Sequence, residues 1–167
     1  MKNSSPCSRC FRPEERCICN QVQSIDNALS VLILQYPREQ YKPLNSAGLC
    51  SLVLKNSALQ IGMSWPNLGR ALGRQADAHG WGVLYFGAGR EAQAPVRVFD
   101  RKKRLLKSPP PFEGIVILDG TWKQSKTLWW RNPWLLKLKR IVLSPPGRSL
   151  RRQAKRDALS TAESIAM

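Results

Sequence analysis

The chain has 167 residues, and its 27 Lys and Arg side chains outnumber its 11 Asp and Glu side chains, a formal net charge of +16 at pH 7. This length predicts one domain with room for a small appended module, and it excludes a large multidomain architecture. Residues 101–167 hold sixteen basic and four acidic side chains, against eleven and seven in residues 1–100. The charge indicates a polyanionic partner, nucleic acid before an anionic membrane, whose phosphates meet the second part of the chain.

No segment of the sequence has the pattern of a membrane span or a secretory signal. The best apolar run, residues 29–34, has the length of an interior strand, far short of the roughly 18 residues that a membrane helix needs. The first seven residues lack the apolar core of a signal peptide. We therefore expect a cytoplasmic protein without a membrane partner, in a reducing compartment where disulfides rarely form.

Four of the five cysteines lie within thirteen residues, as a Cys-x2-Cys pair and a Cys-x-Cys pair. They are Cys7, Cys10, Cys17 and Cys19. Zinc takes four thiolates in a tetrahedron, and it can substitute for the missing core of a segment this short. The spacing predicts a structural zinc in a knuckle at residues 1–24, followed by a second domain at 25–167. Free thiols or a disulfide pair are the alternatives, and Cys50 is interpreted as a buried small hydrophobic residue.

Short apolar runs rich in β-branched residues predict four interior strands. They span residues 28–34, 82–86, 115–118 and 141–143. Continuous runs of this length are typical of a parallel sheet that is covered on both faces. Three further stretches have the pattern of helices, namely residues 44–59, 121–131 and 150–166. This alternation of strands and helices favours an α/β layered fold with a parallel sheet.

Turn-forming and polar segments follow three of the predicted strands. They are residues 86–89, 119–122 and 144–147. Ligands of open α/β sheets bind beyond the carboxyl ends of the strands, so these segments are candidate walls of one site. Asp119 and Gly120 lead into a predicted helix whose exposed amide groups suit a polar ligand. The alternative is structural, with Asp119 or Thr121 capping the helix and Gly120 making the turn.

Aromatic and basic side chains interleave in the predicted helix 121–131 and just beyond it. The aromatic ones are Trp122, Trp129, Trp130 and Trp134, and the basic ones are Lys123, Lys126 and Arg131. Such a mixture can stack bases and hold phosphates. The seven-residue spacing of Trp122 and Trp129 favours another interpretation for these two, the buried face of the helix. Both interpretations stay open for Trp130 and Trp134.

The densest basic segment begins the last predicted helix. Its five cations, which share one helical face, are Arg148, Arg151, Arg152, Lys155 and Arg156. Only Asp157 offers an opposite charge nearby, so contact with an RNA backbone is favoured over a solvated helix face. The other charge run, residues 101–104, lies just before a proline-rich stretch.

Five segments carry motifs that occur together in one family. They are the cysteine cluster and residues 35–48, 84–87, 118–124 and 159–163. Asp119-Gly120-Thr121-Trp122 resembles the signature of the DTW-domain family, the tRNA-uridine aminocarboxypropyltransferases. The other four segments resemble the family's zinc motif, its H-P-x-E...K...N-T-G block, its leucine-tyrosine-proline-glycine segment and its L-S-T-x-E block. This resemblance covers almost the whole chain.

The resemblance implies a SPOUT-like fold with a trefoil knot beside the cofactor cleft. It also implies S-adenosylmethionine as donor, whose 3-amino-3-carboxypropyl group moves to N3 of a tRNA uridine while methylthioadenosine leaves. The expected partners are tRNA and S-adenosylmethionine, and the expected state is a monomer. Such an enzyme must align uracil N3 with the donor's methylene carbon and remove the imide proton.

The resemblance also assigns roles to residues of this chain. Asp119 is the candidate catalytic residue, which either accepts the imide proton or orients the donor's ammonium group. The residues expected to bind the donor are Leu84, Tyr85, Phe86, Gly87, Gly120, Thr121, Trp122, Ser144, Pro145 and Thr161. The residues expected to bind tRNA are Lys42, Asn45, Arg148, Arg151, Arg152, Lys155 and Arg156.

Some positions depart from the family pattern. Tyr36 stands where the family has His, Phe86 where it has Pro, and Ser46-Ala47 where it has Thr-Gly. The family also continues past its L-S-T-x-E block, whereas this sequence stops at Met167, which indicates a truncated member. Two alternatives therefore stand beside the transferase: an RNA methyltransferase that uses the same donor, and a non-catalytic zinc and RNA-binding module.

Overall fold

A six-stranded sheet organises the chain in the computed structural model, which describes residues 7–10, 12–42, 45–85, 95–144, 149 and 159–166. The strands are β1 (Ser30–Gln35), β2 (Ser57–Ile61), β3 (Trp81–Leu84), β4 (Val96–Phe99), β5 (Gly114–Asp119) and β6 (Lys139–Leu143). Their order across the sheet is β2-β1-β5-β3-β6-β4. All neighbouring pairs are parallel except β4 and β6, which are antiparallel. The carboxyl ends of five strands therefore meet along one edge, called the carboxyl edge from here on.

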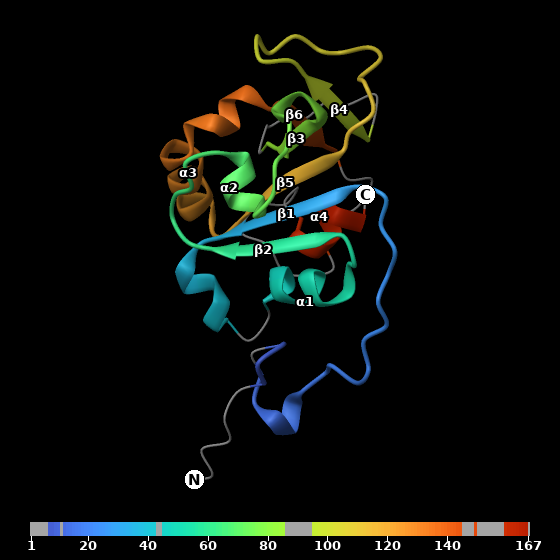
Figure 1. The fold of residues 1–167 in the computed structure, drawn as a ribbon, viewed down its shortest axis with the longest axis vertical. Coiled ribbons are helices and arrows are strands. Elements are labelled where there is room, and N and C mark those ends of the chain that lie inside the picture. Colours follow the sequence, from blue (N-terminus) through green and yellow to red (C-terminus); the bar gives the residue numbers. More distant parts are fainter. Residues whose placement is uncertain are drawn as a thin grey trace.

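The described helices are α1 (Ser46–Val53), α2 (Leu68–Leu72), α3 (Trp122–Arg131) and α4 (Thr161–Ala166). Four 3-10 turns accompany them at Glu14–Arg16, Pro37–Tyr41, Ala78–Gly80 and Pro133–Lys137. Apolar side chains of α2, α3 and the turn at Pro133–Lys137 pack on one face of the sheet. Side chains of α1 and α4 pack on the other face, and Figure 1 shows the strands between the two groups of helices. The predicted α/β layered fold is thus confirmed.

The four predicted interior strands are β1, β3, β5 and β6, and all four are confirmed. Their continuous apolar runs reflect burial on both faces, as at Leu32 and Ile33, which are both fully buried on opposite faces. The strands β2 and β4 were missed. They form the two edges of the sheet and are only partly buried, so polar residues interrupt their apolar pattern.

The prediction of one helix over residues 44–59 is wrong beyond Val53. The chain turns after α1 and returns as β2, which pairs in parallel with β1. The Asn27 side chain holds this turn, since its amide nitrogen donates to the Asn56 carbonyl at 2.9 Å and its oxygen accepts from the Asn56 N–H at 3.0 Å. Pairing with a buried strand has overridden the helical pattern of the sequence.

The helix predicted over residues 121–131 is confirmed as α3, but its buried face differs from the expected one. Trp129 packs against the core, whereas Trp122 is 47% exposed, so the prediction of a buried Trp122 is wrong. Trp122 begins the helix right at the carboxyl edge, beyond the ends of the strands that would cover it. Of the two tryptophans left open, Trp134 is buried and Trp130 is 72% exposed.

Of the helix predicted over residues 150–166, the structure describes only the end, where α4 follows the non-helical residues 159 and 160. The basic stripe predicted at 148–156 lies outside the described residues. None of the helices in the described ranges is both long and apolar enough to cross a bilayer.

Candidate functional site

Two polar residues are the last residues of the central strands β1 and β5, at the carboxyl edge. Gln35 ends β1, Asp119 ends β5, and the two are register partners in the parallel ladder. Side chains alternate between the faces of a sheet, and Val31, Ile33 and Ile117 belong to the core beneath α1 and α4. Gln35 and Asp119 share the parity of these residues, so both side chains point to the α1 and α4 side.

Hydrogen bonds join these side chains to the starts of both helices. The Gln35 amide nitrogen donates to Asp119 Oδ2 and to Asn45 Oδ1, each at 2.9 Å. The Thr161 hydroxyl donates to Asp119 Oδ1. The cluster of Gln35, Asn45, Asp119 and Thr161, called the Asp119 cluster below, therefore unites four distant segments of the chain. Each carboxylate oxygen of Asp119 accepts a bond, which fixes the carboxylate plane.

Helix capping explains how the sequence builds this cluster. Asn45 caps α1, its side chain accepting from the Gly48 N–H at 3.0 Å. Thr121 and Gln124 form a reciprocal capping box at the start of α3, and Ser160 and Glu163 do the same at the start of α4. Three of the resembled motifs are thus helix starts that meet at the carboxyl edge.

The structural interpretation of the 119–122 segment is confirmed at Thr121, whereas ligand binding at this segment stays a prediction. Thr121 caps the helix, as the structural alternative predicts, while Asp119 belongs to the hydrogen-bonded cluster. Gly120 connects Asp119 to Thr121 at a position with little room for a side chain. A Cβ at this position would lie 2.9 Å from Cβ of Gln124 and 3.5 Å from Cβ of Tyr36, so a larger residue would displace the helix start from β1.

Three other residues expected to bind the donor also lie at the carboxyl edge, but their side chains have different environments. Leu84 ends β3 and is buried in the core beneath α4. Tyr85 follows it with a ring against Trp129 at a 5.2 Å centroid distance, and the Arg140 guanidinium lies 5.1 Å from the Tyr85 ring. Tyr85 thus packs on the α3 side, away from the Asp119 carboxylate. Ser144 directly follows β6.

Several predicted site residues lie outside the part of the chain that the structure describes. They are Phe86, Gly87, Pro145, Arg148, Arg151, Arg152, Lys155 and Arg156. Among the described tRNA candidates, Lys42 forms an ion pair with Glu39 at 2.7 Å just after β1. Asn45 lies in the Asp119 cluster instead of on an open surface, so its position fits donor binding better than contact with tRNA.

Sequence reasoning missed Gln35 as a site residue. Its side chain is fully buried, and its amide oxygen has no hydrogen-bond partner among the described residues. The sequence does contain one signal for Gln35: it is a glutamine at the end of an apolar strand with its side chain on the buried face, where an amide needs a polar partner.

Cys50 lies near the Asp119 cluster. Burial raises the pKa of its thiol to about 11, and the Asp119 charge adds to this effect, so Cys50 stays protonated at neutral pH. The interpretation of Cys50 as a buried small residue is confirmed.

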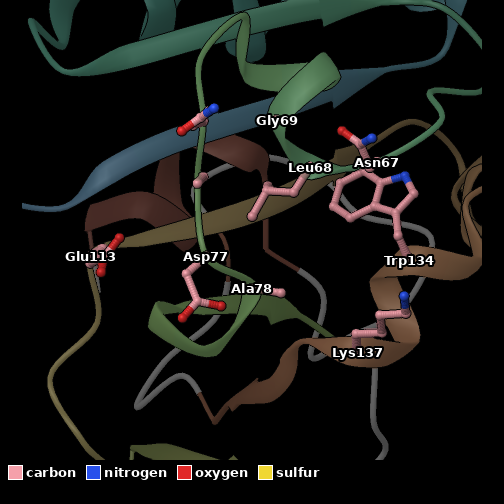
Figure 2. A pocket seen from close by; sticks show the side chains of 10 residues that line it. Asn67, Leu68, Gly69, Asp77, Ala78, Glu113, Trp134 and Lys137 are labelled. Carbon is pink, nitrogen blue, oxygen red and sulfur yellow. The ribbon is translucent and has the colours of Figure 1, made fainter.

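A cavity among the described residues lies at the opposite edge of the sheet. It has a volume of about 690 Å³ and lies at the amino ends of β3 and β5. Figure 2 shows the carboxylates of Asp77 and Glu113 on one side of it and the Trp134 and Lys137 side chains on the other. Ligands of parallel sheets bind at the carboxyl ends, so we assign the candidate active site to the Asp119 cluster and not to this cavity.

The four clustered cysteines form a second candidate site. The sulfur atoms of Cys7, Cys10, Cys17 and Cys19 all lie within 4.8 Å of one another. In Figure 1 their segment lies at the bottom, beyond α1 and away from the sheet. A bridge between Ile25 and Leu54 ties the chain to the end of α1. Four thiols at this spacing fit a tetrahedral metal ion.

Backbone amides favour thiolates at the first pair of cysteines. The Cys10 N–H lowers the pKa of Cys7 to about 6, and the Arg12 N–H lowers the pKa of Cys10. At Cys19, desolvation and then the neighbouring thiols raise the pKa to about 12. Four thiolates this close repel one another unless a cation lies between them, which is the electrostatic environment that a metal ion satisfies.

The mostly parallel sheet, with helices on both faces, defines an α/β protein of the open-sheet class. The chain belongs to the DTW domain family, whose sequence profile matches residues 4–167. The family resemblance stated from the motifs is thereby confirmed.

Curated relatives are similar to this chain at modest identity. The tRNA-uridine aminocarboxypropyltransferase 2 of Macaca fascicularis is 27% identical over 179 residues, which cover 99% of this chain and 56% of the relative. The protein of the same name from Drosophila melanogaster is 28% identical over 167 residues, covering 96% of this chain and 63% of the relative. The chain thus spans less than two thirds of the length of these relatives. No solved structure matches it.

Proposed function

We propose that this chain transfers the 3-amino-3-carboxypropyl group of S-adenosylmethionine to N3 of a uridine in tRNA. The main support is the Asp119 cluster, because it gathers three motifs of the family at the edge where parallel sheets bind ligands. The names of the relatives in Macaca fascicularis and Drosophila melanogaster support the same reaction.

The charge of the Asp119 cluster favours one of the two roles considered for Asp119. The carboxylate and the unpartnered Gln35 amide oxygen are both acceptors, and no cation of the described residues forms an ion pair with Asp119. A half-buried carboxylate with no counter-ion among the described residues suits a ligand that brings its own positive charge. We infer that Asp119 holds the donor's ammonium group, with the Gln35 oxygen as a second acceptor.

The reaction itself forms one bond and breaks another. Uracil N3 attacks the methylene carbon of the aminocarboxypropyl group, the bond from that carbon to sulfur breaks, and methylthioadenosine leaves with the electron pair. The imide proton of N3 passes to a base or to water. Holding the ammonium group fixes which of the sulfonium carbons faces the uridine, and such positioning can supply much of the rate enhancement.

The cysteine cluster has a separate role in this proposal. We propose that Cys7, Cys10, Cys17 and Cys19 hold a structural zinc that organises residues 1–24, a division of the chain that stays a prediction. Metal analysis of the purified protein tests this, with one zinc per chain as the expected result and less than a tenth of an equivalent as the contrary one. Substitution of Cys10 by Ser should release the zinc, while Cys50→Ser should retain it.

The mostly parallel sheet is compatible with the proposed relation to the SPOUT proteins. The predicted trefoil knot and the basic stripe at residues 148–156 remain part of the proposal, since both depend on residues outside the described ranges. Localisation in the cytoplasm and a monomeric state likewise stay predictions.

The decisive experiment is incubation with S-adenosylmethionine and unmodified bulk tRNA, followed by mass spectrometry of the nucleosides and of the spent donor. A uridine heavier by one aminocarboxypropyl group, together with methylthioadenosine, is the expected result. A methylated nucleoside with S-adenosylhomocysteine would show a methyltransferase instead. Neither product, with tRNA binding retained, would show a non-catalytic RNA-binding module.

A further inference from the structure

The charge run at residues 101–104 forms a tight turn after β4. Asp100 organises the turn, since its N–H donates to the Arg104 carbonyl at 2.9 Å and its carboxylate accepts from the Arg104 N–H at 2.8 Å. The chain returns beside β4 through a bridge between Phe99 and Leu105. Four consecutive cations therefore occupy a compact, internally bonded turn at the end of β4.

This turn faces a hollow of about 310 Å³ near the amino end of β6, called the basic hollow below. Its cations are Arg101, Lys102, Arg104, Lys137 and Lys139, and its other lining residues are Ala78, His79 and Asp100. Five cations against one carboxylate give the lining a formal charge of +4, with His79 neutral. Ala78 and Lys137 also line the larger cavity of Figure 2, so the two hollows adjoin.

Contacts within the protein hold two of the cations in place. Arg101 Nε donates to the Lys137 carbonyl at 2.7 Å, and Lys139 Nζ donates to the His79 carbonyl while lying 5.8 Å from the Phe112 ring centroid. Arg104 is the only one of the five that forms an ion pair among the described residues. The other four cations of the basic hollow form no ion pair among the described residues, although the charge of Lys139 acts on the nearby Asp77 carboxylate. The positions of Arg101 and Lys139 are fixed before any ligand binds.

Backbone conformation at Lys103 adds an independent observation. Lys103 has φ of 63°, the only non-glycine residue with positive φ among those described. A lysine is strained in this left-handed region, where glycine would be free of strain. A strained residue at a charged turn motivates a functional hypothesis. Lys103 adds a further cation to this turn, although it does not line the basic hollow itself.

We propose that the basic hollow and the turn at residues 101–104 bind the phosphate backbone of the RNA substrate, an inference that rests on the proposed action on tRNA. Phosphate oxygens suit a concave surface of fixed Arg and Lys side chains. The lining includes no apolar side chain larger than that of Ala78. Protein interfaces instead have an apolar or aromatic core, so RNA fits this surface better than an acidic protein does.

The position of the basic hollow is compatible with simultaneous contact at the Asp119 cluster. The hollow lies at the amino edge of the sheet and the cluster at the carboxyl edge, so the length of one strand separates them, about 20 Å at a rise of roughly 3.3 Å per residue. They are also offset sideways by the two strand spacings from β6 to β5, about 10 Å. The arms of a tRNA are A-form helices of several stacked base pairs, and their length is comparable to this separation. One arm of a tRNA is therefore long enough to present a uridine to Asp119 and its backbone to the basic hollow.

The test compares two double variants that each remove two positive charges. Lys102→Gln with Lys103→Gly changes the turn and leaves its backbone unstrained, because glycine adopts the φ of Lys103 freely. Lys55→Gln with Arg70→Gln removes two exposed cations outside the basic hollow. The affinity for bulk tRNA is measured by fluorescence anisotropy over a range of salt concentrations, and modification is measured in parallel.

We expect the turn variant to bind tRNA about tenfold more weakly at physiological salt, with a salt dependence shallower by about one to two in logarithmic slope. The matched control should weaken binding less than threefold. Equal affinities of the turn variant and the wild type would overturn the proposal, as would displacement of tRNA by polyglutamate at equal charge concentration. Absence of modification by the wild type, with the expected difference in binding, would refute the proposed reaction and leave this surface standing.

Discussion

The two edges of the sheet differ in their chemistry: hydrogen-bonded polar side chains gather at the carboxyl edge, and positive charges gather at the amino edge. The carboxyl edge carries the Asp119 cluster, in which a carboxylate and two amides are ordered by hydrogen bonds. The amino edge carries the cavity of Figure 2 and the basic hollow with its five cations. The comparison teaches that a cavity alone is a poor guide to the site, because the family motifs gather at the carboxyl edge, away from both of these cavities.

The largest expected effect distinguishes carboxylates at the two edges. Asp119→Asn removes the charge that holds the donor's ammonium group, so we expect formation of the modified uridine to fall by about a hundredfold or more. Glu113→Gln makes the same chemical change in the cavity of Figure 2 and should change the rate less than about threefold. Nucleoside mass spectrometry under single-turnover conditions measures both. A greater loss in the Glu113 variant would move the active site to the amino edge.

A smaller effect is expected from the residue that links the members of the Asp119 cluster. Gln35→Leu removes the amide that bonds to Asp119 and Asn45, and it leaves buried acceptors with fewer donors. The free energy of unfolding should fall by about 1–3 kcal/mol. Gln60→Leu on the partly buried edge strand β2 is the matched control, with a change below about 0.5 kcal/mol. Urea denaturation measures both, and equal losses would mean that the cluster contributes nothing specific.

The third prediction concerns the contribution of the N-terminal cap of α3 to the free energy of unfolding. Thr121→Ala removes the hydroxyl that accepts from the Gln124 N–H, and we expect a loss of about 1 kcal/mol in the free energy of unfolding. Thr121→Ser keeps the hydroxyl and should stay within a few tenths of the wild-type value. If chemical denaturation gave the same loss for both substitutions, the methyl group and not the cap would be responsible.

The smallest effect concerns the amino edge and depends on pH. The Arg104 N–H is the main cause that holds the pKa of Asp100 below its ordinary value. A lowered folded-state pKa means that the carboxylate stabilises the fold above its unfolded-state pKa, near pH 4, and that this contribution disappears as the pH falls through the folded-state pKa. The stability difference between wild type and Asp100→Asn should therefore be constant from pH 5 to 8 and vanish in acid. A difference that grew in acid would contradict this assignment.

Interior strands and the position of Asp119 were predictable because local sequence determines them. Continuous apolar runs identify strands buried on both faces, and Asp119 follows such a run directly. The edge strands β2 and β4 were not predictable in the same way, since partial burial leaves no regular pattern. Trp122 was assigned to the wrong environment because a seven-residue spacing shows which residues share a face and not whether the sheet extends far enough to cover it.

Gln35 could not be placed in the site from local sequence. Its partner Asp119 lies 84 residues further along the chain, and only the parallel pairing of β1 with β5 brings the two side chains together. The resemblance named the surrounding block, but the role of Gln35 follows from its burial and its two bonds. The basic hollow was missed for the same reason, because it joins residues 101–104 to Lys137 and Lys139.

The bonds of Asp119 also have a consequence for the order of folding. They close one loop of 84 residues to Gln35 and another of 42 residues to Thr161. Loops of this length carry a large closure entropy, and folds dominated by distant pairings reach the native state slowly. The 119–122 signature is synthesised before Thr161. The hydrogen bond from Thr161 to Asp119 therefore forms only after α4 has been synthesised, and the Asp119 cluster is complete only then.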